Sequence, residues 1–170
     1  MVVAVLWAAP ANAYESYQDY ALRLMRSLPD GAKFRPDLEA YLNSLASTTR
    51  TRRDRRPLEA HTMLRPAARA QALEMLIGNF VGHESKSGYR FKARFEAFAS
   101  EGDHGRYGEN AARDRQSGPV DRTKAKRLFQ QWIDSRGHRR NLLHRDYRYV
   151  STGVIQKGHH IYAIQIFWEK

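Results

Sequence analysis

The chain has 170 residues, and 29 Lys or Arg against 18 Asp or Glu give it a formal net charge of +11. The length suits one domain, and a hydrophobic content of 42% is enough for a packed core, which argues against global disorder. The absence of cysteine excludes disulfides, thiolate metal ligands and cysteine catalysis. The excess of positive charge favours anionic partners, such as nucleic acid, acidic envelope polymers or anionic lipid.

The N-terminus has features of an export signal. An apolar run from Val2 to Ala9 precedes Ala11-Asn12-Ala13, which fits the small-residue pattern of a signal-peptide cleavage site. No basic residue precedes the run, and the alternative is a buried N-terminal strand. We expect residues 1–13 to be a signal peptide and the protein to be periplasmic or extracellular. No segment is long enough to span a membrane, which takes about 20 apolar residues.

Apolar periodicity then predicts a series of helices. The helical patterns cover 15–28, Pro36 to about Arg50, Pro66 to Phe80 and, more weakly, 91–98, and the last runs from Asp121 or Thr123 to about Ser135. Residues 14–35 form an expected N-terminal helical extension, and 36–170 the main domain. Five arginines between Arg50 and Arg56 repel one another, which predicts a solvated loop. Residues 100–119 are rich in glycine and polar residues and indicate mostly loop, apart from 107–112.

The C-terminal residues change to a β pattern. The segments 149–156 and 161–168 are rich in β-forming residues and flank a short loop with Gly158, which predicts a hairpin. Both faces of 161–168 are apolar, as expected for a strand that is covered on both sides. With several helices available, the predicted fold is α/β, a three-layer α/β/α sandwich around an antiparallel sheet.

Three short segments carry residues with possible chemistry. The first is Gly82-His83-Glu84-Ser85, the second is Tyr107-Gly108-Glu109-Asn110, and the third runs from Trp132 through Ser135, Gly137 and His138 to Leu143. Gly137 is placed to cap the preceding helix, which puts His138 just after a rigid turn. Taken singly, each segment also fits a structural role: a surface histidine, a turn with a structural glutamate, and a helix-capping histidine.

Taken together, and in this order, the three segments resemble the CAP superfamily of cysteine-rich secretory, antigen 5 and pathogenesis-related 1 proteins. The likeness is greatest to its bacterial secreted branch, the SCP-like or YkwD-like proteins. It rests on His83-x-Ser85, Gly108-Glu109-Asn110, the segment from Trp132 to Leu143, and the C-terminal hairpin, and it spans about 36–169. The family fold is an α/β/α sandwich with an antiparallel sheet.

The resemblance implies a cleft at which His83 and His138 hold a divalent metal such as Zn²⁺ and Glu109 is an acidic ligand or general base. The place of a second acid is taken by Ser135, which reduces the negative charge and weakens metal binding. Asp134 is turned by about 100° around the helix and is not expected to replace it. Ser85 and Asn110, with Ser135, are expected to support the cleft through hydrogen bonds to its histidines.

Three functions remain open. The first is a secreted, monomeric binding module for an anionic envelope or extracellular ligand, whether lipid, glycan or protein. The alternative is a metal-dependent hydrolase of an envelope peptide, glycan or ester, with Glu109 as its catalytic group. Nucleic-acid binding through Arg50–Arg56 and Arg136–Arg148 is disfavoured, since the chain shows no nucleic-acid-binding motif and an export signal is expected.

Overall fold

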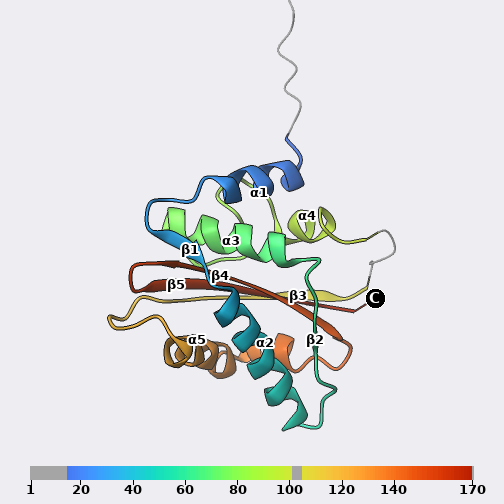
Figure 1. The fold of residues 1–170 in the computed structure, drawn as a ribbon. Helices are drawn as coiled ribbons and strands as arrows, with labels where there is room; N and C mark the ends of the chain where they lie inside the picture. Colours follow the sequence, from blue (N-terminus) through green and yellow to red (C-terminus); the bar gives the residue numbers. More distant parts are fainter. Residues whose placement is uncertain (1–14, 101–104, 170) are drawn as a thin grey trace, which may run out of the picture.

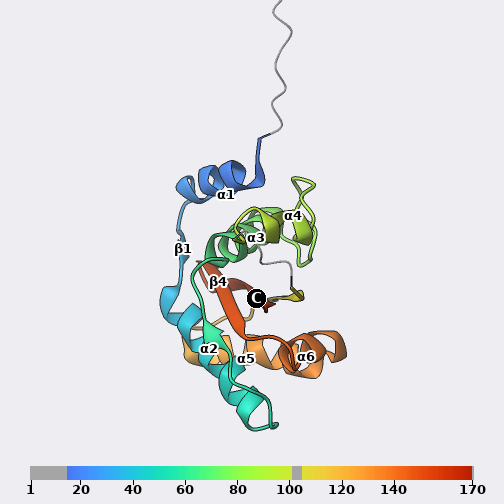
Figure 2. The ribbon, with the colours of Figure 1, turned by 90° about the vertical axis from the view of Figure 1, so that its right-hand side faces the viewer.

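An antiparallel sheet separates two layers of helices in the computed structural model, which describes residues 15–100 and 105–169 (Figure 1). The helices are α1 Tyr17–Arg26, α2 Pro36–Thr51, α3 Arg65–Gly78, α4 Phe91–Glu96, α5 Arg122–Asp134 and α6 Arg136–Leu142. The strands are β1 Ala32–Phe34, β2 Glu59–Ala60, β3 Tyr107–Asp114, β4 Tyr149–Lys157 and β5 His160–Trp168. Helices α1, α3 and α4 cover one face of the sheet, and α2, α5 and α6 cover the other (Figures 1 and 2). The three-layer fold predicted from the sequence is confirmed.

The sheet is built on the C-terminal hairpin of β4 and β5. The two strands pair antiparallel and turn at Gly158, whose φ of +56° lies in the left-handed region that glycine adopts without strain. The strand order is β1-β4-β5-β3, and β2 pairs in parallel with β4. Strand β3 pairs with β5 along its whole length and so ends this order. The hairpin is therefore confirmed. On their outer sides its two strands pair with strands from earlier in the chain: β4 with β1 and β2, and β5 with β3.

Strand β5 divides its side chains between two hydrophobic cores, as the apolar residues on both of its faces predicted. Ile161, Ala163 and Phe167 pack on the side of α2 and α5. Tyr162, Ile164, Ile166 and Trp168 pack on the side of α1 and α3. Successive side chains of a strand point to opposite faces, so one strand contributes to both cores.

Three local predictions were wrong. Residues 107–114 form the complete strand β3, although 113–114 were expected in a loop and 107–112 were assigned to no strand. Gly137 does not cap α5: Ser135 ends α5 and begins α6, so Gly137 and His138 lie within α6. Arg50 is not solvated but fully buried in α2, where its guanidinium reaches backbone carbonyls of another segment. Neighbouring arginines Arg52 and Arg53 are exposed, as expected.

Helix α1, in the expected N-terminal extension, packs against the core on the α3 side. The hydroxyl of Ser16 accepts a hydrogen bond from the backbone N–H of Asp19 at 3.1 Å, which caps the helix. Tyr17 is buried in the core on the α3 side, with its ring 5.0 Å from that of Tyr89. The expected signal peptide, 1–13, lies outside the described residues. Among the residues described, no helix has the length and apolar character needed to cross a membrane.

Gly153 of β4 allows the closest approach between the sheet and α3. A methyl group there would lie 2.4 Å from backbone atoms of Ala68 and Arg69. We expect Gly153→Ala to lower the free energy of unfolding by about 3 kcal/mol, because backbone on both sides must move apart. As a control, Gly137→Ala in α6 meets nothing within 4 Å and should raise it by about 1 kcal/mol. Urea denaturation measures both, and equal effects of the two substitutions would contradict the packing argument.

Candidate functional site

The site lies at the sheet edge formed by β3, where loops and helices of both layers meet. Side chains alternate along this strand, so Glu109 points toward the layer of α3 and α4 while Asn110 points toward α6. The loop after α3 brings His83 to one flank of the edge, and α6 brings His138 to the other. The structure thus brings together His83, Glu109 and His138, the three residues that the sequence indicated.

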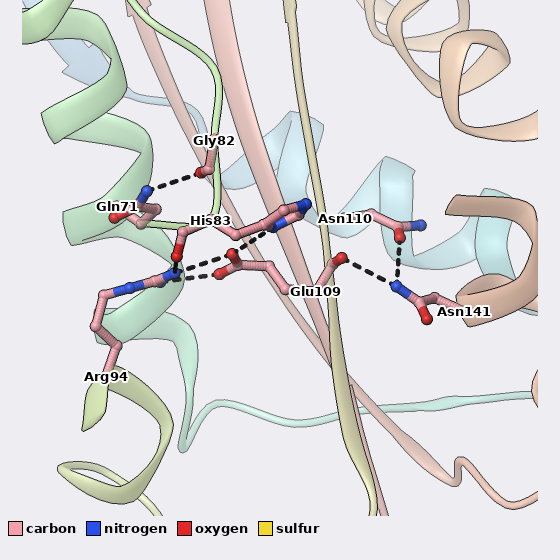
Figure 3. Close-up of polar contacts among 7 residues, drawn as sticks. All are labelled: Gln71, Gly82, His83, Arg94, Glu109, Asn110 and Asn141. Atoms are coloured by element: carbon pink, nitrogen blue, oxygen red, sulfur yellow. Dashed lines mark hydrogen bonds and ion pairs between the residues drawn. The ribbon is translucent and has the colours of Figure 1, made fainter. Parts of the chain in front are cut away.

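Glu109 is held by a buried arginine that the sequence analysis missed. Arg94 Nη1 donates to Glu109 Oε2 at 2.8 Å, and Arg94 Nη2 donates to Oε1 at 2.9 Å (Figure 3). Both side chains are almost fully buried, with 0% and 1% of their surfaces exposed. Paired hydrogen bonds between guanidinium and carboxylate are among the strong ones in proteins. The only sequence signal was one of two basic residues, Lys92 and Arg94, between Phe91 and Phe95 in a weak helical pattern.

Arg94 also fixes the backbone of His83. Its Nη2 donates to the His83 carbonyl at 2.8 Å, and Gln71 Nε2 donates to the preceding carbonyl of Gly82 at 2.9 Å (Figure 3). Burial alone would lower the pKa of Arg94, but the Glu109 carboxylate reverses this and raises it. The guanidinium therefore stays charged and ties α4, β3 and the His83 loop together. We call His83, Arg94, Glu109 and His138 the edge site.

The imidazole of His83 has a fixed tautomer when it is neutral. Its Nδ1 lies 2.9 Å from Glu109 Oε1, and an ionised carboxylate only accepts hydrogen bonds, so Nδ1 carries the proton. The lone pair is then on Nε2, on the opposite side of the ring. The side chain is 53% exposed, so this nitrogen is open to a ligand. A carboxylate behind a histidine is the arrangement that commonly orients metal-binding imidazoles.

His138 approaches from the other layer. Its backbone N–H donates to the Ser135 hydroxyl at 3.5 Å, and its carbonyl accepts from Asn110 Nδ2 at 3.1 Å. The centre of its ring lies 6.2 Å from that of His83. Its Nδ1 is buried without a hydrogen-bond partner among the described residues. Burial, and secondarily the neighbouring His83, lower the pKa of His138 below its ordinary 6.5.

The supporting residues act on the backbone instead of the imidazole rings. Asn141 Nδ2 donates to the Glu109 carbonyl at 3.0 Å and to Asn110 Oδ1 at 3.1 Å, which covers part of the free edge of β3 (Figure 3). Within the described residues, the Ser85 hydroxyl makes no hydrogen bond to His83 or His138. Its hydroxyl pairs with that of Ser87, which in turn donates to Glu74 Oε1 at 3.0 Å. Ser85 therefore fixes the turn that follows His83.

These residues fit a cation held by two imidazoles better than a centre with three protein ligands. Both oxygens of Glu109 are hydrogen-bonded to Arg94, so ligation by Glu109 would require breaking a buried ion pair. Within residues 15–100 and 105–169, no three His, Asp or Glu side chains are grouped to hold a metal ion. The available donors are Nε2 of His83 and a ring nitrogen of His138, whose Nδ1 has no partner among the described residues.

Comparison with known proteins agrees with the fold and with the family that the sequence resembles. The model of the cysteine-rich secretory protein family, CAP, matches residues 34–168. The Bacillus subtilis protein YkwD is 27% identical over 121 residues, a match covering 71% of this chain and 43% of YkwD.

Solved structures show the same architecture. An extracellular protein with an SCP domain from Bacillus anthracis superposes with a TM-score of 0.63 at 22% identity, covering 79% of this chain and 41% of that one. An outer surface protein from Borrelia burgdorferi gives a TM-score of 0.67 at 15% identity, covering 79% and 93%. The match therefore spans less than half the length of YkwD and of the B. anthracis chain.

We predict that Arg94→Met lowers the free energy of unfolding by about 3–5 kcal/mol, because it leaves the Glu109 carboxylate buried and unpaired. The double variant Arg94→Met/Glu109→Leu should be more stable than Arg94→Met, since no charge is then left buried. Arg23→Met is the control: its ion pair with Glu15 is exposed to solvent, so its loss should change the free energy of unfolding far less. Urea denaturation measures all three, and a double variant no more stable than Arg94→Met would contradict the pairing.

His138 should make stability depend on pH in a defined direction. Because its pKa is lower in the folded chain than the ordinary 6.5, the unfolded chain binds a proton that the folded chain does not. The free energy of unfolding should therefore fall as the pH decreases from 6.5 toward the folded-state pKa, and His138 should have no effect above this window. We expect His138→Gln to flatten this decline. NMR titration of the imidazole is the direct check, and a pKa at or above 6.5 would refute it.

Proposed function

Because the chain belongs to the cysteine-rich secretory protein family (CAP), we propose that it is an exported binding protein whose edge site takes a divalent cation. The related structures from B. anthracis and B. burgdorferi are described as extracellular and outer-surface proteins. The positive charge of the chain suits an anionic ligand from the same surroundings. Export, the cation and the ligand are the parts of this proposal that experiments must establish.

The main support for the proposal is that the Glu109 carboxylate is already hydrogen-bonded to Arg94 and His83. A general base must be free to take a proton from the reacting group, but both oxygens of Glu109 accept hydrogen bonds from a permanently charged guanidinium. Glu109 therefore acts as a positioning residue for the His83 ring. This disfavours the hydrolase alternative, in which Glu109 is a metal ligand or general base, and leaves binding as the function that the geometry supports best.

The two histidines supply the binding chemistry. Glu109 keeps the proton on Nδ1 of His83, so the nitrogen facing outward has a lone pair. Burial, by lowering the pKa of His138, keeps its imidazole neutral at neutral pH, which is the form that binds cations. A bound divalent cation would keep open coordination positions for oxygen atoms of a ligand. With only two protein ligands, we expect weaker binding than at structural zinc sites, which have four.

Calorimetric titration with Zn²⁺ near neutral pH tests this proposal. We expect one cation per chain, and we expect His83→Ala and His138→Ala each to weaken binding at least about tenfold. Glu109→Gln should weaken it less, because it disturbs only the orientation of one ligand. The affinity should also fall as the pH drops below about 6.5, since protons compete for the imidazoles.

The matched control removes two imidazoles elsewhere. His159 and His160 are adjacent at the β4–β5 turn, with ring centres 4.4 Å apart. The variant His159→Ala/His160→Ala should bind Zn²⁺ at the edge site as well as the wild type does. If this variant loses the cation while His83→Ala and His138→Ala keep it, the edge site is not the binding site.

A further inference from the structure

The outer surface of α6 borders a basic hollow that is separate from the edge site. Its volume is about 520 Å³, within the range of small-ligand sites. The residues that matter here are Arg136, Arg139, Arg140, Arg145, His144 and Asp146. We call this the arginine hollow. Figure 2 shows α6 in the same helical layer as α2 and α5.

The geometry of α6 places the hollow and the edge site on opposite sides of one helix. Each residue of an α-helix is turned by about 100° from the one before it. Arg136, Arg139 and Arg140 therefore lie within an arc of about 100°, whereas His138 lies about 200° from Arg136. A ligand in the arginine hollow therefore need not touch His138.

The charge in the hollow is largely uncompensated. Arg136, Arg140 and Arg145 are exposed, and none is ion-paired with a carboxylate of the described residues. Arg139 is half-buried and donates to the carbonyl of Ile133. The one carboxylate of the lining, Asp146, already faces Arg106 at 3.5 Å. Like charges gathered around a concave surface repel one another, and a bound anion relieves that repulsion.

The backbone beneath the hollow is fixed by the buried Arg50. Its guanidinium donates to the carbonyls of Leu142 at 2.9 Å, His144 at 2.7 Å and Tyr147 at 3.0 Å. These hydrogen bonds anchor the end of α6 and the turn that carries Arg145. The exposed guanidinium groups therefore project from an ordered backbone, which reduces the entropy lost when they bind a ligand.

We propose that the arginine hollow binds phosphate groups of a flexible phosphodiester-linked polymer. Its cationic side chains are all arginines, whose planar fork donates paired hydrogen bonds to phosphate. The four oxygens of a phosphodiester lie tetrahedrally around phosphorus, with the charge on the two non-bridging ones, so guanidinium groups can approach it from more directions than they can a planar carboxylate. Among the described residues that line the hollow, His144 has the only aromatic ring, so there is no platform on which successive bases would stack. The polymer is recognised through its phosphates alone.

The test uses short-chain inorganic polyphosphate as the probe, with fluorescence anisotropy at low and moderate salt. The variant Arg136→Gln/Arg140→Gln/Arg145→Gln should lose at least about tenfold in affinity and show a weaker salt dependence, because three phosphate contacts are removed. The matched control is Arg52→Gln/Arg53→Gln/Lys126→Gln, which removes three exposed cations around a different hollow. The control should lose less than about threefold.

Other outcomes would overturn the proposal. Equal losses in the two triple variants mean general attraction by net charge, with no site. Equal affinity for polyglutamate and polyphosphate removes the preference for phosphate. Tighter binding of single-stranded oligonucleotide than of polyphosphate at the same salt points to a nucleic-acid partner instead. His138→Ala should leave polyphosphate binding unchanged, so a failure here is distinguishable from a failure of the cation proposal.

Discussion

The buried ion pair between Arg94 and Glu109 is the interaction on which the rest of the site depends. Its two hydrogen bonds join α4 to β3, and a third from the same guanidinium holds the loop that carries His83. Taking two charges out of water is costly, and such pairs persist where their hydrogen bonds are well made. Here the pair fixes the position of the His83 imidazole. It also leaves the Glu109 carboxylate unavailable as a metal ligand or general base.

The position of β3 at the end of the sheet order explains how both helical layers contribute to one site. A central strand would be flanked by other strands, but the free side of β3 is covered by side chains, among them Asn141. His83 arrives from the layer of α3 and His138 from the layer of α5 and α6. The distance between the rings of His83 and His138 thus depends on how both layers pack against the sheet. At Gly153, the sheet and α3 pack backbone against backbone.

The sequence predicted the parts that follow from periodicity and motif. The two-faced apolar pattern of 161–168 led to the layered fold, and the three short segments led to His83, Glu109 and His138. Arg94 and Arg50 could not be found in this way, because their partners lie on segments distant in sequence and a buried arginine looks like a surface one. Strand β3 was missed because its glycine and polar residues face neighbours that only the tertiary structure supplies, such as Tyr147 and Asn141 beside Gly108.

The burial of Tyr17 bears on where the folding unit ends. This residue lies outside the stretch matched by the family model, yet its ring is in the core on the α3 side, and its hydroxyl lies close enough to Arg94 and Glu109 for their charges to act on its pKa. Burial, the largest effect, raises that pKa, so the phenol stays neutral in the core near the ion pair. Helix α1 thus contributes a buried side chain to the surroundings of the charges at the centre of the site. The hydrophobic core therefore includes side chains that precede the family pattern, and a fragment cut at that pattern would lose them.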